Sequence, residues 1–431
     1  MSGVEQRRKD FPALSSAHGA TPPVYLDSAC MSLVPRAVLD ALEEYYTDYP
    51  GCAGRSLHRF AEEVGHRYEG ARESFARFLG LPSPDGIVFL RNATEAINLV
   101  AQGLDWRPGD RVLVTDQEHN SNLVVWQRLA AQRGIRLAHL RLPADGTFDL
   151  EALDRELDQG VRLVSFFHTS NLDGRTLPIR EIAARAHHRG AKVLIDGCQA
   201  APHQRVDLTA LGVDFYALSL HKMMGPSGTG LLAGAPERLA ELSPLVVGGE
   251  TVEWTTLTEH QLRPPPHRFE AGLQNYAGVL GAAAGLRYLE RVGLDEVDAH
   301  DRAVNARATK GLADDPRIHL LGPEEPARRP SIYSFTLDGV DPNDAALFLD
   351  EGYRVMVRSG MHCVHSWYRE RSLPGSIRAS FYLYTSPHDI DAFVAGVREL
   401  LERIHGPAPP GPSSTPVPRR TSSGRTRRRA S

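Results

Sequence analysis

A lysine that follows an apolar strand is the residue of this chain best suited to covalent chemistry. Lys222 ends the run Ser219-Leu220-His221-Lys222, and Asp196 follows the upstream apolar run 191–195. A lysine amine held in a partly buried turn can form a Schiff base with a carbonyl compound. Pyridoxal phosphate is the cofactor that combines such a lysine with a carboxylate for its pyridinium nitrogen. Lys222 and Asp196 together therefore indicate a pyridoxal-phosphate site.

A cysteine in a polar segment is the second candidate for chemistry. Cys363 lies in the Gly-containing run 357–365, near Arg358, His362 and His365. Neighbouring positive charge favours the thiolate, which is the nucleophilic form. A lone cysteine is otherwise usually a small buried hydrophobe. We predict that Cys363 is a nucleophile, whereas Cys198, in the turn after Asp196, packs against the sheet.

The segment 91–98 is a candidate phosphate site. Thr94 follows Asn92 between an expected strand and an expected helix. The free N–H groups of a helix N-terminus bind phosphate, but Thr94 could equally be an ordinary helix cap. Ser219 and His221 could supply further phosphate contacts. The Gly-rich run 225–230 fits neither nucleotide-loop pattern and is read as a tight turn.

His119 allows three interpretations: a core residue, a ring stacked on a cofactor, or a metal ligand. A metal site would combine it with His168 and Asp196. Their spacing matches no known ligand pattern, so no metal is expected.

Alternating strands and helices would bring these residues to one edge. We expect strands over 87–90, 111–115, 162–167, 192–195, 215–218 and 230–233, with helices such as 121–133 and 179–188 between them. This alternation predicts βαβ units and a mostly parallel sheet. His119, His168, Asp196 and the run 219–222 each follow a strand. Ligands of open α/β sheets bind beyond the carboxyl ends of the strands, which is where these polar residues would converge.

The pattern changes after residue 285. We expect helices at 284–292 and 297–312, strands at 331–337, 353–357 and 376–384, and a closing helix at 387–405. The predicted organisation is an N-terminal segment, 1–23, packed with the small domain, a large cofactor-binding domain, 24–285, and a small α+β domain, 286–405. Residues 406–431, rich in Arg, Pro and Ser, are predicted to be disordered.

Composition is that of an ordinary globular protein, with 42% hydrophobic and 24% charged residues among 431. The net charge of −4 includes six arginines in the tail, without which 43 basic residues face 53 acidic ones. The arginines of the tail could attract nucleic acid or acidic partners, but a solvated disordered end is the favoured interpretation, so nucleic acid is not expected as a partner. The four cysteines form no CxxC pair, and no apolar stretch is long enough for a membrane span. The cytoplasm is the expected location.

The motifs resemble a known family over residues 25–403. The chain is similar to pyridoxal-phosphate enzymes of the class V aminotransferase superfamily, and within it to the group II cysteine desulfurases and selenocysteine lyases. The motifs that carry the resemblance are segments 92–100, 118–122, 168–171, 196–200, 219–222, 268–272, 358–363 and 378–380. The resemblance implies the aspartate-aminotransferase-like fold, fold type I.

The resemblance also assigns roles around the cofactor. Lys222 would hold pyridoxal phosphate covalently, Asp196 would pair with the pyridinium nitrogen, and His119 would stack on the ring. Gln199 would meet the phenolic oxygen. The phosphate would be held by Thr94, Ser219 and His221.

For the substrate, the resemblance implies L-cysteine. Arg378 would bind its carboxylate, with Asn171 nearby and Arg55 reaching over from the partner subunit of a homodimer. Cys363 would attack the sulfur, forming a persulfide and leaving alanine, and an acceptor protein or small molecule would take the sulfur. Selenocysteine lysis, transamination and epimerisation remain as alternatives, as does a sulfur carrier or regulator that is not an enzyme.

Several positions depart from the family pattern. Ala93 stands where threonine is usual, Leu220 where glycine is common, and Gly54 where histidine is common. Leu273 and Tyr276 fall where the family usually carries threonines, one of which reaches the phosphate of the neighbouring subunit. These changes leave that contact in doubt and a specialised substrate or acceptor open.

Overall fold

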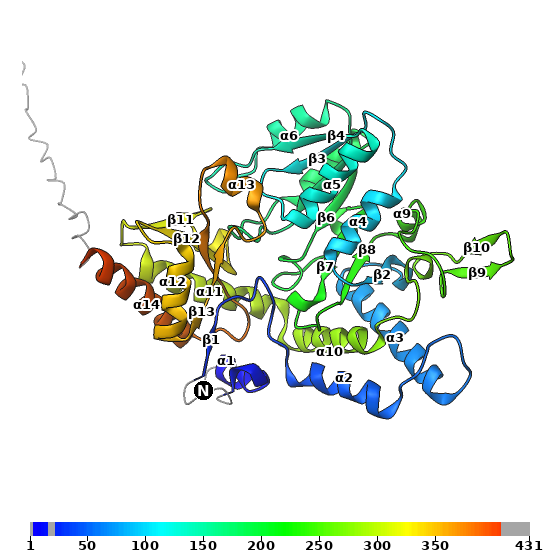
Figure 1. Cartoon of the computed structure of the whole chain (residues 1–431), viewed down its shortest axis with the longest axis horizontal. Coiled ribbons are helices and arrows are strands. Elements are labelled where there is room, and N and C mark those ends of the chain that lie inside the picture. The colour runs from blue at the N-terminus through cyan, green and yellow to red at the C-terminus, as the bar shows by residue number, and fades with distance from the viewer. Residues whose placement is uncertain (1–2, 16–21, 407–431) are drawn as a thin grey trace, which may run out of the picture.

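A computed structural model describes residues 3–15 and 22–406 of the chain. Figure 1 shows two lobes: a large one around a wide sheet, and a smaller one that contains the C-terminal helix. No helix within the described residues is long and apolar enough to cross a membrane. The predicted tail, apart from Gly406, lies outside the described residues.

A seven-stranded sheet forms the large lobe. Its spatial order is β2-β8-β7-β6-β5-β3-β4. The strands from β7 to β4 pair in parallel, whereas β8 runs antiparallel to both β7 and β2. The strand bounds are β2 Ile87–Leu90, β3 Arg111–Thr115, β4 Arg136–Leu140, β5 Val161–Phe167, β6 Lys192–Asp196, β7 Phe215–Ser219 and β8 Gly230–Ala233.

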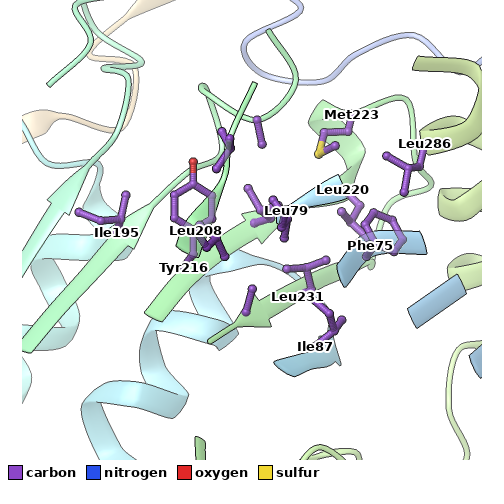
Figure 2. Packing of buried hydrophobic residues seen from close by; sticks show 14 of the residues in the cluster. Phe75, Leu79, Ile87, Ile195, Leu208, Tyr216, Leu220, Met223, Leu231 and Leu286 are labelled. Atoms are coloured by element: carbon purple, nitrogen blue, oxygen red, sulfur yellow. The ribbon is translucent and has the colours of Figure 1, made fainter. Parts of the chain in front are cut away.

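Both faces of this sheet are buried, and successive residues of a strand point to opposite faces. Ile195 and Tyr216 belong to one apolar cluster, and their neighbours Leu194 and Phe215 belong to the other. Figure 2 shows Ile195 and Tyr216 in the first cluster, with Leu231 from β8. Strands covered on both faces read as continuous apolar runs, which is why they stand out in the sequence.

Helices cover the two faces. The helix bounds in the large lobe are α2 Arg36–Asp48, α3 Arg59–Phe78, α4 Ala93–Gly103, α5 Asn120–Arg133, α6 Leu150–Leu157, α7 Ile179–His188, α8 Leu208–Leu211, α9 Pro236–Ala240 and α10 Tyr276–Val292. Helices α4 and α5 supply side chains to one cluster, and α3, α7 and α10 to the other. A β-hairpin, β9 Val252–Thr255 and β10 His260–Leu262, projects from this lobe (Figure 1).

The smaller lobe is built on a four-stranded antiparallel sheet, ordered β11-β12-β15-β14. Its strands are β11 Ile318–Leu321, β12 Ile332–Leu337, β14 Arg358–Gly360 and β15 Ser376–Ser380. Its helices are α11 Leu294–Leu312, α12 Pro342–Tyr353, α13 His365–Glu370 and α14 Pro387–His405. Side chains of α11, α12 and α14 form a separate apolar core with this sheet.

The N-terminal segment contacts both lobes, and its Phe11 and Leu14 belong to the apolar cluster that contains Ile195 of the large sheet. Strand β1, Val24–Tyr25, pairs in parallel with β13, Val355–Met356. In α1, Gly3–Arg8, the guanidinium of Arg8 lies 2.5 Å from the carboxylate of Asp389 in α14. These contacts bring the turn after β1 beside β15, where Asp27 bridges to Ser380.

The strands predicted at 87–90, 111–115 and 230–233 form with the same bounds, and the other three differ by one residue at an end. The pattern did not indicate β4, β11, β14 or the β9–β10 hairpin. Strand β4 is an edge strand of mixed polarity, and β14 has only three residues, so neither gives a clear apolar run. Helix α10 continues through the predicted domain boundary at residue 285.

One glycine lets two elements approach closely at the sheet edge. Gly230 begins β8, and a Cβ atom there would lie 2.4 Å from Cα of Asn92. Asn92 caps α4, its side chain accepting a hydrogen bond from Glu95 N at 3.0 Å. A residue without a side chain at 230 therefore lets the N-terminus of α4 sit against the sheet.

Candidate active site

A cavity of about 210 Å³ opens where the large sheet meets the smaller lobe. Nine of the eleven predicted site residues line it: Thr94, His119, Asn171, Asp196, Ser219, His221, Lys222, Cys363 and Arg378. They come from segments up to 284 residues apart in the chain, between Thr94 and Arg378. The fold therefore brings together side chains that lie far apart in the sequence.

We call six lining residues from the large lobe the sheet side of the cavity: Thr94, His119, Asp196, Ser219, His221 and Lys222. Asp196 ends β6 and Ser219 ends β7, the neighbouring strand. Lys222 ends the short 3-10 helix that continues β7. These positions follow directly from the strand ends of a parallel sheet.

The N-termini of two helices complete the sheet side. Ala93 N, at the start of α4, donates to Ser219 Oγ at 2.9 Å, and Thr94 Oγ1 lies 2.7 Å from Ser121 Oγ. His119 caps α5, its Nδ1 accepting from Ser121 N at 3.1 Å. Hydroxyl groups and a helix N-terminus in one place favour an anion such as phosphate.

Burial keeps the histidines of the sheet side neutral. It lowers the pKa of His119 to about 4, with the nearby Lys222 ammonium acting in the same direction. Burial and Lys222 likewise lower the pKa of His221 to about 4. A neutral imidazole can pack against an aromatic ring without bringing a buried charge with it.

We call Cys30, Arg358, His362, Cys363 and Arg378 the cysteine side of the cavity. All five line it. Arg358 and Arg378 stand directly opposite each other on the antiparallel strands β14 and β15. Like charges at such positions repel, so this arrangement requires anionic neighbours.

Arg378 is fully buried, and one of its nitrogens is left without a partner. Its Nη1 donates to the Asn171 carbonyl at 3.0 Å, and its Nη2 donates to Asp27 Oδ1 at 3.1 Å. Its Nε is buried and has no hydrogen-bond partner among the described residues. Burial lowers the pKa of this arginine. A buried guanidinium with a free N–H is suited to an incoming carboxylate.

The cysteine turn is held in a left-handed conformation. His362 and Cys363 have φ of 47° and 59°. Asn120 N donates to the Cys363 carbonyl at 2.7 Å, and Asn171 Nδ2 donates to the His362 carbonyl at 2.7 Å. Left-handed backbone at two successive non-glycine residues is costly, and these contacts from the large lobe hold it in place.

The thiols differ in what they can do. Arg358 Nη2 lies 3.5 Å from Cys363 Sγ, and Cys363 is a partly exposed residue that lines the cavity. Cys198 is buried, and burial raises its pKa to about 12. Cys198 is therefore held as the neutral thiol, whereas Cys363 faces a cation and the cavity.

Two predicted residues lie outside the cavity lining. Gln199 is buried, and its Nε2 donates to the Ala29 carbonyl at 2.8 Å. Arg55 forms an ion pair with Glu250 on the surface of the large lobe. Their predicted roles, toward the phenolic oxygen and from a partner subunit, stay predictions.

Four lining residues were not singled out as site residues by the sequence reasoning: Ala29, Cys30, Asn92 and Ser121. Asp27, which touches Arg378, was also missed as a site residue. Asp27 and Cys30 lie in a turn after a two-residue strand, and no local pattern marks them. Within the described residues, no group of three or more His, Cys, Asp or Glu is placed to hold a metal ion.

The set of side chains fits pyridoxal phosphate in its chemistry. The cavity presents an amine, a carboxylate on the adjacent strand, a neutral imidazole, and hydroxyls at a helix N-terminus. These match, in turn, the aldehyde, the pyridinium nitrogen, the ring face and the phosphate of that cofactor. The Arg378 guanidinium, which also lines the cavity, then remains for a second anion.

Comparison with known proteins identifies the family. The family model "Aminotransferase class-V" matches residues 24–393. The chain belongs to this family. A protein of Streptomyces coelicolor named "Probable cysteine desulfurase" is 40% identical over 405 residues, which are 92% of this chain and 97% of the relative. The "Cysteine desulfurase" of Dickeya dadantii is 38% identical over 406 residues, 93% of this chain and 97% of the relative.

Solved structures of two cysteine desulfurases share the fold. The apo cysteine desulfurase of Thermococcus onnurineus has a TM-score of 0.88 at 35% identity, covering 93% of this chain and 98% of its own. The cysteine desulfurase CsdA of Escherichia coli, in an S-sulfonic acid form, has a TM-score of 0.85 at 33% identity, covering 94% and 99%. The predicted fold type I architecture is thus confirmed.

Proposed function

We propose that this protein is a pyridoxal-phosphate-dependent cysteine desulfurase, which converts L-cysteine to L-alanine and retains the sulfur as a persulfide on Cys363. The observation that carries the proposal is the position of Cys363. Its partly accessible thiol faces a guanidinium in the same cavity as Lys222 and Asp196. A transaminase has no need of a thiol nucleophile there.

We propose that the sheet side holds the cofactor. Lys222 would attach it covalently, and Asp196 would face its pyridinium nitrogen. His119 would pack on the ring, while Thr94, Ser219 and His221 hold the phosphate with the N-terminus of α4. When bound, pyridoxal phosphate supplies an electron sink for negative charge at the substrate Cα.

We propose that the cysteine side acts on the substrate. Arg378, which lines the cavity, would take the carboxylate, with the Asn171 carbonyl accepting a hydrogen bond from its Nη1. The Cys363 thiolate would attack the substrate thiol sulfur. The new S–S bond forms as the C–S bond breaks, and the electron pair of that bond stays on carbon, which then takes a proton. Free L-cysteine and the Cys363 thiol thereby become alanine and a persulfide.

We propose a homodimer in the cytoplasm as the working form. Leu245, Val246 and Leu273 are exposed apolar residues that line one surface cleft beside β2 and β8. Apolar side chains grouped in this way are typical of a subunit interface. Leu273 is 61% exposed, which suits contact with a partner subunit even though it cannot replace a threonine as a phosphate donor. Light scattering during size-exclusion chromatography would measure the mass.

The test is incubation with L-cysteine. We expect equal amounts of alanine and of sulfane sulfur on the first turnover, with the added sulfur found on the Cys363 peptide by mass spectrometry. Alanine formed without any protein persulfide would favour a lyase that releases its sulfur directly. If the persulfide forms on Cys363 as proposed, repeated turnover should require a thiol reductant or an acceptor protein.

A further inference from the structure

A second thiol lies beside Cys363 in the same cavity. Arg358 Nη1 lies 2.9 Å from Cys30 Sγ, and its Nη2 lies 3.5 Å from Cys363 Sγ. The two terminal nitrogens belong to one rigid, planar guanidinium, so the two sulfurs contact neighbouring atoms of a single group. Both cysteines line the cavity and both are partly accessible.

The backbone on each side of the pair is anchored. The residue before Cys30 donates its N–H to Ser380 Oγ at 2.9 Å, and its carbonyl accepts from Gln199 Nε2 at 2.8 Å. The Cys363 carbonyl accepts from Asn120 N at 2.7 Å. These bonds tie each cysteine to segments far away in the chain, so the two thiols are held near each other by the fold and not by a flexible loop.

The charges around the pair suit an anionic sulfur. Arg358 and Arg378 stand opposite each other, and Asp27 supplies one carboxylate, 3.1 Å from Arg378. One thiolate on Arg358 would balance the second arginine. Two thiolates would exceed that balance. A reaction that moves a negative charge from one sulfur to the other leaves the local charge unchanged.

We propose that Cys30 is a relay thiol that takes the sulfane sulfur from the Cys363 persulfide. This inference rests on the proposed function. The Cys30 thiolate attacks the terminal sulfur of the Cys363 persulfide, and a new S–S bond forms. The old S–S bond breaks, and its electron pair leaves on Cys363 Sγ as a thiolate. The proton stays on the transferred sulfur, and no oxidant or reductant is required.

The relay explains why one arginine contacts both sulfurs. Arg358 would stabilise the attacking thiolate of Cys30 and then the departing thiolate of Cys363. Cys363 would be returned to the reactive form while the sulfane sulfur waits on Cys30 for its acceptor. In the alternative reaction, the Cys30 thiolate would attack Cys363 Sγ, forming a disulfide between the two cysteines and releasing hydrosulfide. That outcome would leave Arg358 without an anion.

The experiment locates the sulfur. The enzyme with its cofactor is given one equivalent of L-cysteine, then alkylated, digested and analysed by mass spectrometry over time, while alanine is assayed separately. We expect added sulfur first on the Cys363 peptide and then on the Cys30 peptide. In Cys30→Ser the sulfur should stay on Cys363, and in Cys363→Ser neither peptide should carry it. Cys52→Ser, which removes a partly accessible thiol outside the cavity lining, should match the wild type.

The outcomes separate the relay from the proposed function. Alanine and a Cys363 persulfide, with no sulfur on Cys30 at any time, would overturn the relay alone. The absence of both alanine and persulfide would overturn the proposed function, and the relay is then tested with inorganic polysulfide in place of L-cysteine. Labelling of Cys30 should be several-fold higher in the wild type than in Cys363→Ser. Equal labelling in the two proteins would overturn the relay.

Discussion

The sheet side and the cysteine side of the cavity are built in different ways. The sheet side stands on strand ends and helix N-termini of regular geometry, such as Asp196 at the end of β6. The cysteine side combines a turn with two left-handed residues, a turn after a two-residue strand, and two arginines that face each other. A regular scaffold suits a group that stays bound. The cysteine side concentrates positive charge and thiols, which suits groups that arrive, react and leave.

The largest effect should come from the sheet side. Lys222→Ala should remove the absorbance of bound cofactor at the edge of the visible range and reduce alanine formation to background, because the variant has no amine to hold the aldehyde. Spectra of protein purified with pyridoxal phosphate would check this. Lys192→Ala, which removes a partly exposed lysine paired with Glu241, should keep both spectrum and activity. A retained band in Lys222→Ala would show that this lysine is misassigned.

On the cysteine side, Cys363→Ser should separate binding from reaction. The sheet side is untouched, so the cofactor spectrum should remain. Alanine release should fall by about 100-fold or more, since a serine hydroxyl is barely ionised at neutral pH and is a poor nucleophile toward sulfur. Cys198→Ser and Cys52→Ser serve as controls in a spectrophotometric alanine assay. Full turnover by Cys363→Ser would show that the cysteine side does not supply the nucleophile.

A smaller effect should follow from Arg378→Lys, which keeps the charge but loses the guanidinium fork. Weaker carboxylate binding should lower kcat/KM for L-cysteine by about 10- to 100-fold, mainly through KM. The surface variant Arg307→Lys, whose wild-type residue pairs with Asp391, is the matched control. Steady-state kinetics at several cysteine concentrations would measure the difference. An unchanged KM would remove Arg378 from substrate binding.

The smallest effect concerns stability and pH. His168 is buried, its backbone N–H donates to the Asp196 carbonyl at 2.8 Å, and burial lowers the pKa of its imidazole to about 4. As pH falls from 6.5 toward 4, the unfolded chain takes up this proton and the folded chain does not, so folding stability decreases. His168→Gln should remove at most about 3 kcal/mol of that pH dependence.

Urea unfolding at pH 7 and pH 5, followed by tryptophan fluorescence, would test this. His319→Gln, at an exposed residue beside Asp338, should retain the wild-type difference between the two pH values. An identical difference in His168→Gln would mean that this histidine does not contribute to acid sensitivity. A buried neutral histidine next to Asp196 would then not be a feature that distinguishes the sheet side from the cysteine side.

The two sides also differ in what the sequence could predict. The sheet side could be predicted because β6 and β7 are buried on both faces and read as apolar runs, with Asp196 and Lys222 placed just beyond them. The family motifs then assigned the roles of His119 and Thr94, which the residues alone had left open. The cavity that these residues share then follows from the rule that parallel strands end at one edge.

The cysteine side could be predicted from the sequence only in part. Cys363 was found because arginine and histidines surround it in the sequence. Cys30 and Asp27 were not, since their place beside Arg358 and Arg378 depends on contacts between residues more than 300 positions apart. Pairing across such distances leaves no period or spacing in the chain. The β9–β10 hairpin was missed for a local reason: its strands are short and mostly exposed.

The close approach of Gly230 to Asn92 limits how this site can change in evolution. Any side chain at 230 would meet the backbone of the α4 cap, and backbone cannot move aside as a flexible side chain can. A single substitution there would push the helix N-terminus off the sheet edge. Descendants of this sequence that keep the sheet side are therefore expected to keep glycine at 230. New specificities are expected to arise at positions such as Cys30 and Leu273, where a substitution changes the side chain without displacing the backbone.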